Sequence, residues 1–236
     1  MGILSDNRIC RICSVNKTHD ANTPATFQSE KVEGFDFVES EPVAAYQKTY
    51  DRIFWDLDHA ELELTGSYVD YANLIHAATH LRLVLERVIT ASFIASYTIF
   101  QEAQESVMTA KNFGEMRKKL KKLNSNYWPV AFGQMTHNGQ TLLGVKPDVG
   151  VQESEVGRFW GQLSGILHAP NPFKEKTHSP DQDFVMLKDL VSQLKELLDS
   201  HIVQLADSSE TFYLRRLPNG EISFQVFRTE TPLLRN

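Results

Sequence analysis

Hydrophobic residues recur every three or four positions through most of the chain between residues 40 and 206, which is the spacing of one face of an α-helix. Proline, glycine and Asn-Gly positions interrupt this pattern, so it predicts separate helices. These helices cover residues 40–66, 68–99, 112–123, 154–168 and 180–205. The later half of the second helix is apolar nearly all round, which is typical of a central helix packed on several sides. The pattern therefore predicts a helical bundle.

Local signals mark several of the helix ends. Asn112 is a good N-cap for the third helix, because its side chain can accept a hydrogen bond from the first turn. Ser179, followed by a proline and by Gln182, predicts a capping box at the start of the fifth helix. Pro170 and Pro172 end the fourth helix, since proline cannot continue one.

Two segments carry the signals of a β-hairpin. An Asn-Gly pair lies between the short apolar runs 130–132 and 141–143. Near the C-terminus, residues 212–217 and 222–227 flank a Pro-Asn-Gly turn, and the second of these runs alternates with a period of two. We expect short strands at the first position and a terminal hairpin at the second.

The sequence thus predicts a mainly α protein: a helical bundle of about five helices with a small irregular N-terminal region and a C-terminal β-hairpin. The N-terminal region covers residues 1–39, the bundle residues 40–206 and the hairpin residues 207–236. A chain of 236 residues is long enough to bury one main core without disulfides or metals.

Charge and hydropathy narrow the classes of function. The chain has 24 basic and 30 acidic residues and a net charge of −6, so any contact with nucleic acid must come from a local patch. Residues 88–100 form the longest apolar window, which is shorter than the roughly 20 residues that a membrane span needs. The first residues lack the apolar stretch of a secretory signal. We therefore expect a cytoplasmic protein that does not enter a membrane.

Cys10 and Cys13 are the two cysteines of the chain, and His19 follows six residues later. The pair supplies half of the ligands of a tetrahedral zinc site, and His19 could supply a third. The alternative is that these are two small side chains in a mobile N-terminal segment. Apart from this zinc ion, we expect no cofactor.

The third helix carries a run of basic residues. Arg117, Lys118, Lys121 and Lys122 must project to water or to an anion, because the same helix keeps an intact apolar stripe. A solvated face is one interpretation. The other is contact with phosphate groups, with Trp128 just downstream as a surface on which unpaired bases could stack.

The second helix carries two pairs of polar residues at four-residue spacing. His76 and His80 share a face, and we interpret them as exposed or interfacial histidines; the alternative is a metal-binding pair. Arg82 and Glu86 lie where the helix is otherwise apolar, so we expect them to form a partly buried ion pair with an architectural role.

The fourth helix offers candidate catalytic residues. Glycines at positions 157, 161 and 165 line one side of it, and each destabilises the helix by about 1 kcal/mol relative to alanine, so we expect another surface to approach closely. His168 opens onto the same side at the helix end, Arg158 lies upstream and Asn171 follows. A histidine beside a cationic arginine is what metal-independent RNA cleavage requires. Alternatively, His168 caps the last turn and Asn171 holds the loop.

At residues 81–86, with Arg82 and Glu86, and at residues 166–173 (ILHAPNPF), the chain resembles uncharacterised bacterial proteins with an all-α domain similar to the HEPN superfamily. The likeness covers roughly residues 68–206. It implies a helical bundle, and a ribonuclease site in which an arginine and a histidine of one helix meet in a cleft that two subunits often share. Arg158 and His168 are the corresponding residues here, with nine residues between them.

Residues 10–31 also resemble the first half of an HNH-type zinc finger, whose second half is missing. The HEPN-like resemblance implies an intracellular protein that acts on or near RNA in phage defence or a toxin–antitoxin setting, with His168, Arg158 and Asn171 as the site. Bundles of this kind often associate through a glycine-lined helix, so we also expect a homodimer. The alternative is a non-catalytic binding module that contacts a protein partner or nucleic acid through Lys118, Lys121 and Lys122.

Overall fold

A computed structural model describes residues 41–66, 70–95, 110, 112–137, 140–168, 179–204 and 210–228. Within these residues the helices are α1 (Glu41–Glu63), α2 (Tyr71–Ala95), α5 (Phe113–Leu123), α6 (Glu153–Leu167) and α7 (Pro180–Leu198). The strands are β1 (Val130–His137), β2 (Gln140–Lys146), β3 (Ser200–Gln204), β4 (Glu210–Arg216) and β5 (Ile222–Arg228). Cys10, Cys13, His19 and Asn171 lie outside the described residues.

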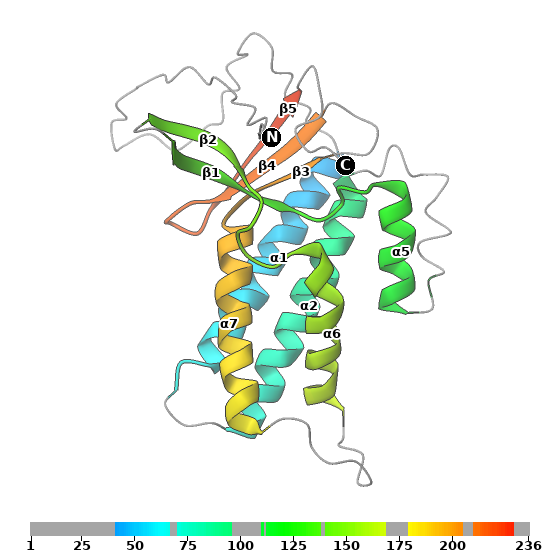
Figure 1. The fold of residues 1–236 in the computed structure, drawn as a ribbon, viewed down its shortest axis with the longest axis vertical. Coiled ribbons are helices and arrows are strands. Elements are labelled where there is room, and N and C mark those ends of the chain that lie inside the picture. Colours follow the sequence, from blue (N-terminus) through cyan, green and yellow to red (C-terminus); the bar gives the residue numbers. More distant parts are fainter. Residues whose placement is uncertain are drawn as a thin grey trace, which may run out of the picture.

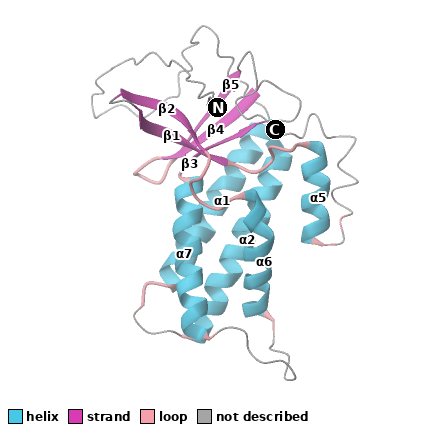
Figure 2. Cartoon of the chain, in the orientation of Figure 1, coloured by secondary structure: helices cyan, strands magenta, loops and turns pink. Residues whose placement is uncertain are grey.

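Helices and strands form two parts of one structure (Figure 1). The helices α1, α2, α6 and α7 run side by side as a bundle, and the sheet crosses one end of it, while α5 stands at the side near that end (Figures 1 and 2). The packing of α1 against the antiparallel α2 is the most extensive contact between helices. The prediction of a mainly α protein with C-terminal β-structure is confirmed.

The sheet is larger than the predicted terminal hairpin. All five strands pair antiparallel in the order β2-β1-β3-β4-β5. Both predicted hairpins are present, with longer strands than expected for the first, and β3 joins them: Val130 of β1 pairs with Ile202 of β3. The C-terminal hairpin is therefore one edge of a continuous sheet and not a separate appendage.

The predicted extension of the last helix to residue 205 is wrong. The helix α7 ends at Leu198, and residues 200–204 form β3. His201, Ile202 and Val203 are all buried, so neither face of this strand shows the alternation by which a half-buried strand is recognised. A short segment that is buried on both faces and follows a helix directly cannot be told from more helix on periodicity alone.

The helical stripes predicted from the sequence do form the core. On α1, Tyr46, Tyr50, Ile53 and Leu57 are fully buried, and the later half of α2 is buried on several sides, as expected for a central helix. No helix within the described residues has the length and apolar character needed to cross a membrane.

The predicted caps are also confirmed. The side chain of Asn112 accepts a hydrogen bond of 2.9 Å from the backbone N–H of Glu115. At the start of α7, the Ser179 hydroxyl accepts from the N–H of Gln182, and the Gln182 side chain accepts from the N–H of Ser179 in return. Gly150 was not singled out by the pattern, yet its φ of +72° and a backbone oxygen 2.6 Å from where a Cβ would lie make glycine necessary there.

A buried histidine of β3 packs against α1. His201 is fully buried against the ring of Tyr50, with ring centroids 4.8 Å apart, and its Nδ1 donates to the carbonyl oxygen of Leu198. Its Nε2 has no hydrogen-bond partner among the described residues. Burial lowers the pKa of His201 to about 4, so the ring is neutral in the folded protein.

This burial predicts a loss of stability in mild acid. The unfolded chain binds a proton on His201 near pH 6.5 and the folded chain only near pH 4, so the free energy of unfolding should fall as the pH drops from 6.5 to 4, by roughly 3 kcal/mol. Urea unfolding across this range measures it. In His201→Asn, whose amide can still donate to Leu198, the free energy of unfolding should change less between pH 6.5 and pH 4. An unchanged pH dependence would contradict the assignment of this effect to His201.

Candidate functional site

Two of the predicted catalytic residues, Arg158 and His168, lie near opposite ends of α6 and have different surroundings. His168 is the exposed C-cap of α6, where its backbone N–H donates to the carbonyl oxygen of Ser164 over 3.0 Å. Arg158 is about half exposed and its guanidinium donates to Glu155, 2.8 Å away. Ten residues of helix rise by roughly 15 Å, which is the separation of the two residues along the axis of α6.

The glycine side of α6 is largely open. A Cβ at Gly157 would lie 2.8 Å from Nη1 of Arg117, so another side chain does approach there. At Gly161 and Gly165 no atom of the other described residues, apart from the helix itself, lies within 4 Å of a Cβ position. The close approach expected along this side is therefore present at the first glycine and not at the other two.

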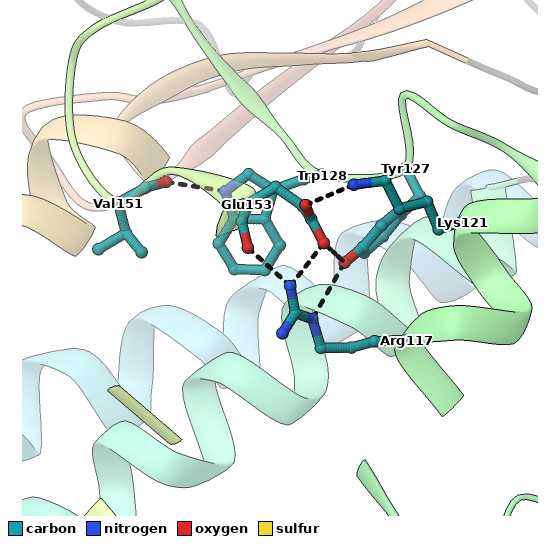
Figure 3. Close-up of polar contacts among 6 residues, drawn as sticks. All are labelled: Arg117, Lys121, Tyr127, Trp128, Val151 and Glu153. Carbon is teal, nitrogen blue, oxygen red and sulfur yellow. Dashed lines mark hydrogen bonds and ion pairs between the residues drawn. The ribbon is translucent and has the colours of Figure 1, made fainter. Parts of the chain in front are cut away.

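The basic run on α5 contributes mainly to an internal clamp (Figure 3). Arg117 donates to the carboxylate of Glu153 over 2.5 Å and to its backbone carbonyl over 2.7 Å. Lys121 and the Tyr127 hydroxyl donate to the same carboxylate over 2.9 and 2.7 Å. The clamp joins α5 to the first turn of α6. Glu153 holds Arg117 and Lys121, whereas Lys118 and Lys122 are exposed.

Trp128 belongs to the same structural unit. Its ring is 5% exposed, and its Nε1–H donates to the carbonyl oxygen of Val151 over 2.8 Å (Figure 3). In this position the ring cannot stack on a base. The predicted nucleic-acid surface is therefore reduced to exposed lysines without the aromatic platform.

The Arg82–Glu86 pair is partly buried, as predicted. Nε of Arg82 donates to Glu86 over 3.1 Å, and Nε1 of Trp160 on α6 donates to the same carboxylate oxygen over 3.1 Å. The Trp160 ring stacks on Phe113 with centroids 5.0 Å apart. The pair thus connects α2 to α6, and through the stacked rings to α5.

A second polar cluster, which the sequence analysis did not single out, lies between α1 and α2. Asp56 of α1 is fully buried, and its carboxylate contacts His80 over 2.9 Å and Arg87, both of α2. Arg52, one turn earlier on α1, lies 3.9 Å from the same carboxylate. A buried carboxylate is costly unless it is paired, and here three cationic or hydrogen-bonding groups surround it.

His59 lies beside this cluster. Its Nδ1 is 2.7 Å from the carbonyl oxygen of Trp55, and its ring packs on the Trp55 ring with centroids 3.7 Å apart. The centroids of the His59 and His80 rings are 5.6 Å apart. We refer to Asp56, His59 and His80 as the histidine–aspartate cluster.

The hydrogen bonds assign the tautomers of both rings. A carbonyl or carboxylate oxygen only accepts, so Nδ1 carries the proton in His59 and in His80. Neither Nε2 makes a hydrogen bond within the described residues, so each presents a lone pair. Burial, with a further contribution from His59, lowers the pKa of His80 below its usual 6.5, and the ring is neutral at pH 7.

Sequence reasoning found part of this cluster. The sequence places His76 and His80 on one face of the second helix, but Asp56, the partner of His80, lies 24 residues earlier on another helix. His76 lies instead beside Glu63. A signal for Asp56 does exist: it falls three residues after Ile53 and four before Ala60, so an aspartate occupies a position on the buried stripe of α1.

Comparison with known proteins adds no family to this picture: no family model, no curated protein and no solved structure matches the chain.

The clamp on α5 predicts a stability effect that depends on pH. Burial opposes ionisation of Glu153, but the hydrogen bonds from Lys121, Tyr127 and Arg117 outweigh it and lower the pKa of Glu153 to about 2. Glu153→Gln should lower the free energy of unfolding at pH 7 by roughly 2 kcal/mol, because charged hydrogen bonds are lost. The difference from the original protein should shrink as the pH falls from 4.5 toward 2, where Glu153 becomes protonated.

The matched control is Glu155→Gln on the same helix. Glu155 pairs with the half-exposed Arg158, so the change should lower stability by less than about 1 kcal/mol. Equal effects of the two variants in urea unfolding at pH 7 would contradict the assigned role of the clamp.

Proposed function

We propose that this protein acts on RNA as a metal-independent endoribonuclease, with the histidine–aspartate cluster as its reactive centre. The observation that carries the proposal is the pair of imidazoles 5.6 Å apart, each with Nδ1 bonded to an oxygen and with Nε2 presented as a lone pair. His80 is the more constrained of the two, because a fully buried carboxylate orients it. Orientation of a histidine by a carboxylate is a common way to fix a general base.

The proposed reaction is transfer of the phosphoryl group within the RNA. Nε2 of His80 accepts the proton of a ribose 2′-hydroxyl, and the 2′-oxygen attacks the adjacent phosphorus. The bond from phosphorus to the 5′-oxygen breaks, and that oxygen takes a proton from Nε2 of His59, which must start the reaction with both ring nitrogens protonated and then returns to the lone-pair form. The products are a 2′,3′-cyclic phosphate and a 5′-hydroxyl end. His80 is given the role of base because its lowered pKa keeps it neutral at pH 7.

Cationic side chains beside the pair suit a phosphate substrate. The Arg52 side chain is 52% exposed and lies with its Cζ 3.9 Å from the centre of the Trp55 ring, next to His59. It can offer a guanidinium to a phosphate without leaving the cluster. Arg87 contacts Asp56 and is less exposed, so its role is to hold the carboxylate. The resemblance to HEPN proteins implies the same class of reaction, which is cleavage of RNA. It implies Arg158 and His168 as the site, however, and not the histidine–aspartate cluster.

A second candidate function is a non-catalytic interaction module. At Gly161 and Gly165, nothing in the described part of the chain outside α6 lies within 4 Å of a Cβ position, which would let another backbone pack closely, as in a homodimer. Lys118 and Lys122 remain exposed and could contact a nucleic acid or an acidic protein. This candidate predicts binding without cleavage.

Cleavage of total RNA in the presence of EDTA distinguishes the two candidates. His80→Asn should lower the rate of cleavage roughly 100-fold or more, because general base catalysis contributes that much. His59→Gln should also lower it, and the rate of the original protein should pass through a maximum with pH. His168→Ala is the matched control, since this exposed histidine is outside the cluster; it should leave the rate unchanged.

Circular dichroism of each variant establishes that the fold is kept. Cleavage that survives His80→Asn and disappears in His168→Ala would place the chemistry on α6 instead. No cleavage by the folded original protein would remove the first candidate and leave the interaction module.

A further inference from the structure

We infer that His59 and His80 also form a binding site for a divalent transition metal of the zinc class, and that the bound metal blocks the proposed ribonuclease. Only the second half of this inference rests on the proposed function. Binding of the metal depends on the two Nε2 atoms and the ligands around them, and not on the reaction that they serve.

The orientation of the two rings favours metal binding. Histidines that ligate a metal through one ring nitrogen nearly always donate the other N–H to a carboxylate or a backbone carbonyl, which fixes the tautomer. His80 donates its Nδ1–H to the carboxylate of Asp56, and His59 donates to the carbonyl of Trp55. Both rings therefore have the outer hydrogen bond of a metal ligand already made, and both lone pairs are available.

The same two helices can also supply further ligands for the metal. Glu63 lies four residues after His59 on α1, and His76 lies four residues before His80 on α2, so each helix contributes two groups on one face. Nδ1 of His76 is 3.6 Å from a carboxylate oxygen of Glu63. Within the described residues no three such groups surround one point already. The His76 side chain is 61% exposed, so it can turn toward the pair without disturbing the core.

The ligand types select the metal. Three imidazoles and one carboxylate suit Zn²⁺, Ni²⁺ or Cu²⁺, whereas Mg²⁺ and Ca²⁺ require oxygen ligands. The charge of the buried Asp56 is largely offset by Arg87, so the imidazoles must provide most of the binding. A metal on Nε2 of His80 and a proton from a ribose hydroxyl would compete for the same lone pair.

Isothermal titration of the full chain, without an affinity tag, with zinc chloride at pH 7.5 tests the inference. Cys10→Ser and Cys13→Ser are introduced together to remove the N-terminal thiols as competing ligands. We expect one zinc ion per chain, no binding at this site in His59→Gln or His80→Asn, and at least a tenfold weaker affinity in His76→Ala. His168→Ala is the control and should bind as the parent does.

The outcomes separate the two proposals. Zinc binding that is unchanged in His59→Gln and His80→Asn, or no binding by the folded parent, overturns the inference. Zinc binding with no ribonuclease activity leaves the site in place and refutes only the proposed function. If the parent cleaves RNA and zinc binds at this site, the rate of cleavage should fall in proportion to the fraction of protein that holds zinc. An unchanged rate would refute the inferred inhibition by zinc.

Discussion

The burial of one carboxylate constrains the whole α1–α2 pair. Asp56 is fully buried, and ionised carboxylates in such positions are stable only when paired and hydrogen-bonded. Its partners His80 and Arg87 both come from α2, so the carboxylate restricts the rotation and the register of α2 against α1. The same contact sets the tautomer of His80. One interaction thus stabilises the helix pair and prepares a ring nitrogen for chemistry.

Other charged residues of the chain have architectural roles. Glu153 collects hydrogen bonds from Arg117, Lys121 and Tyr127, and the clamp attaches α5 to α6. Glu86 accepts from Arg82 and Trp160 and joins α2 to α6. Charge density along a sequence is therefore a poor guide to a binding surface here, because the most basic helix directs two of its cations toward a carboxylate of the same chain.

Local features of this fold were predictable and distant ones were not. Helical periodicity, the Asn112 and Ser179 caps and the two hairpins depend on neighbours within a few residues, and all were predicted from the sequence. The strand β3 was missed because its residues are buried on both faces. The pairing of β1 with β3, which creates the continuous sheet, joins segments about 70 residues apart and leaves no periodic trace. The candidate site could not be predicted for the same reason, because Asp56 and His80 meet only when α1 and α2 pack.

Nitrogen NMR of the imidazole rings tests whether buried Asp56 and the Trp55 carbonyl hold two histidines with protonated Nδ1 and unprotonated Nε2. Spectra of ¹⁵N-histidine-labelled protein at pH 7.5, assigned with His59→Gln and His80→Asn, report which nitrogen carries the proton. We expect a protonated Nδ1 and an unprotonated Nε2 for both rings. A protonated Nε2, or an averaged signal from exchanging tautomers at His80, would contradict this assignment.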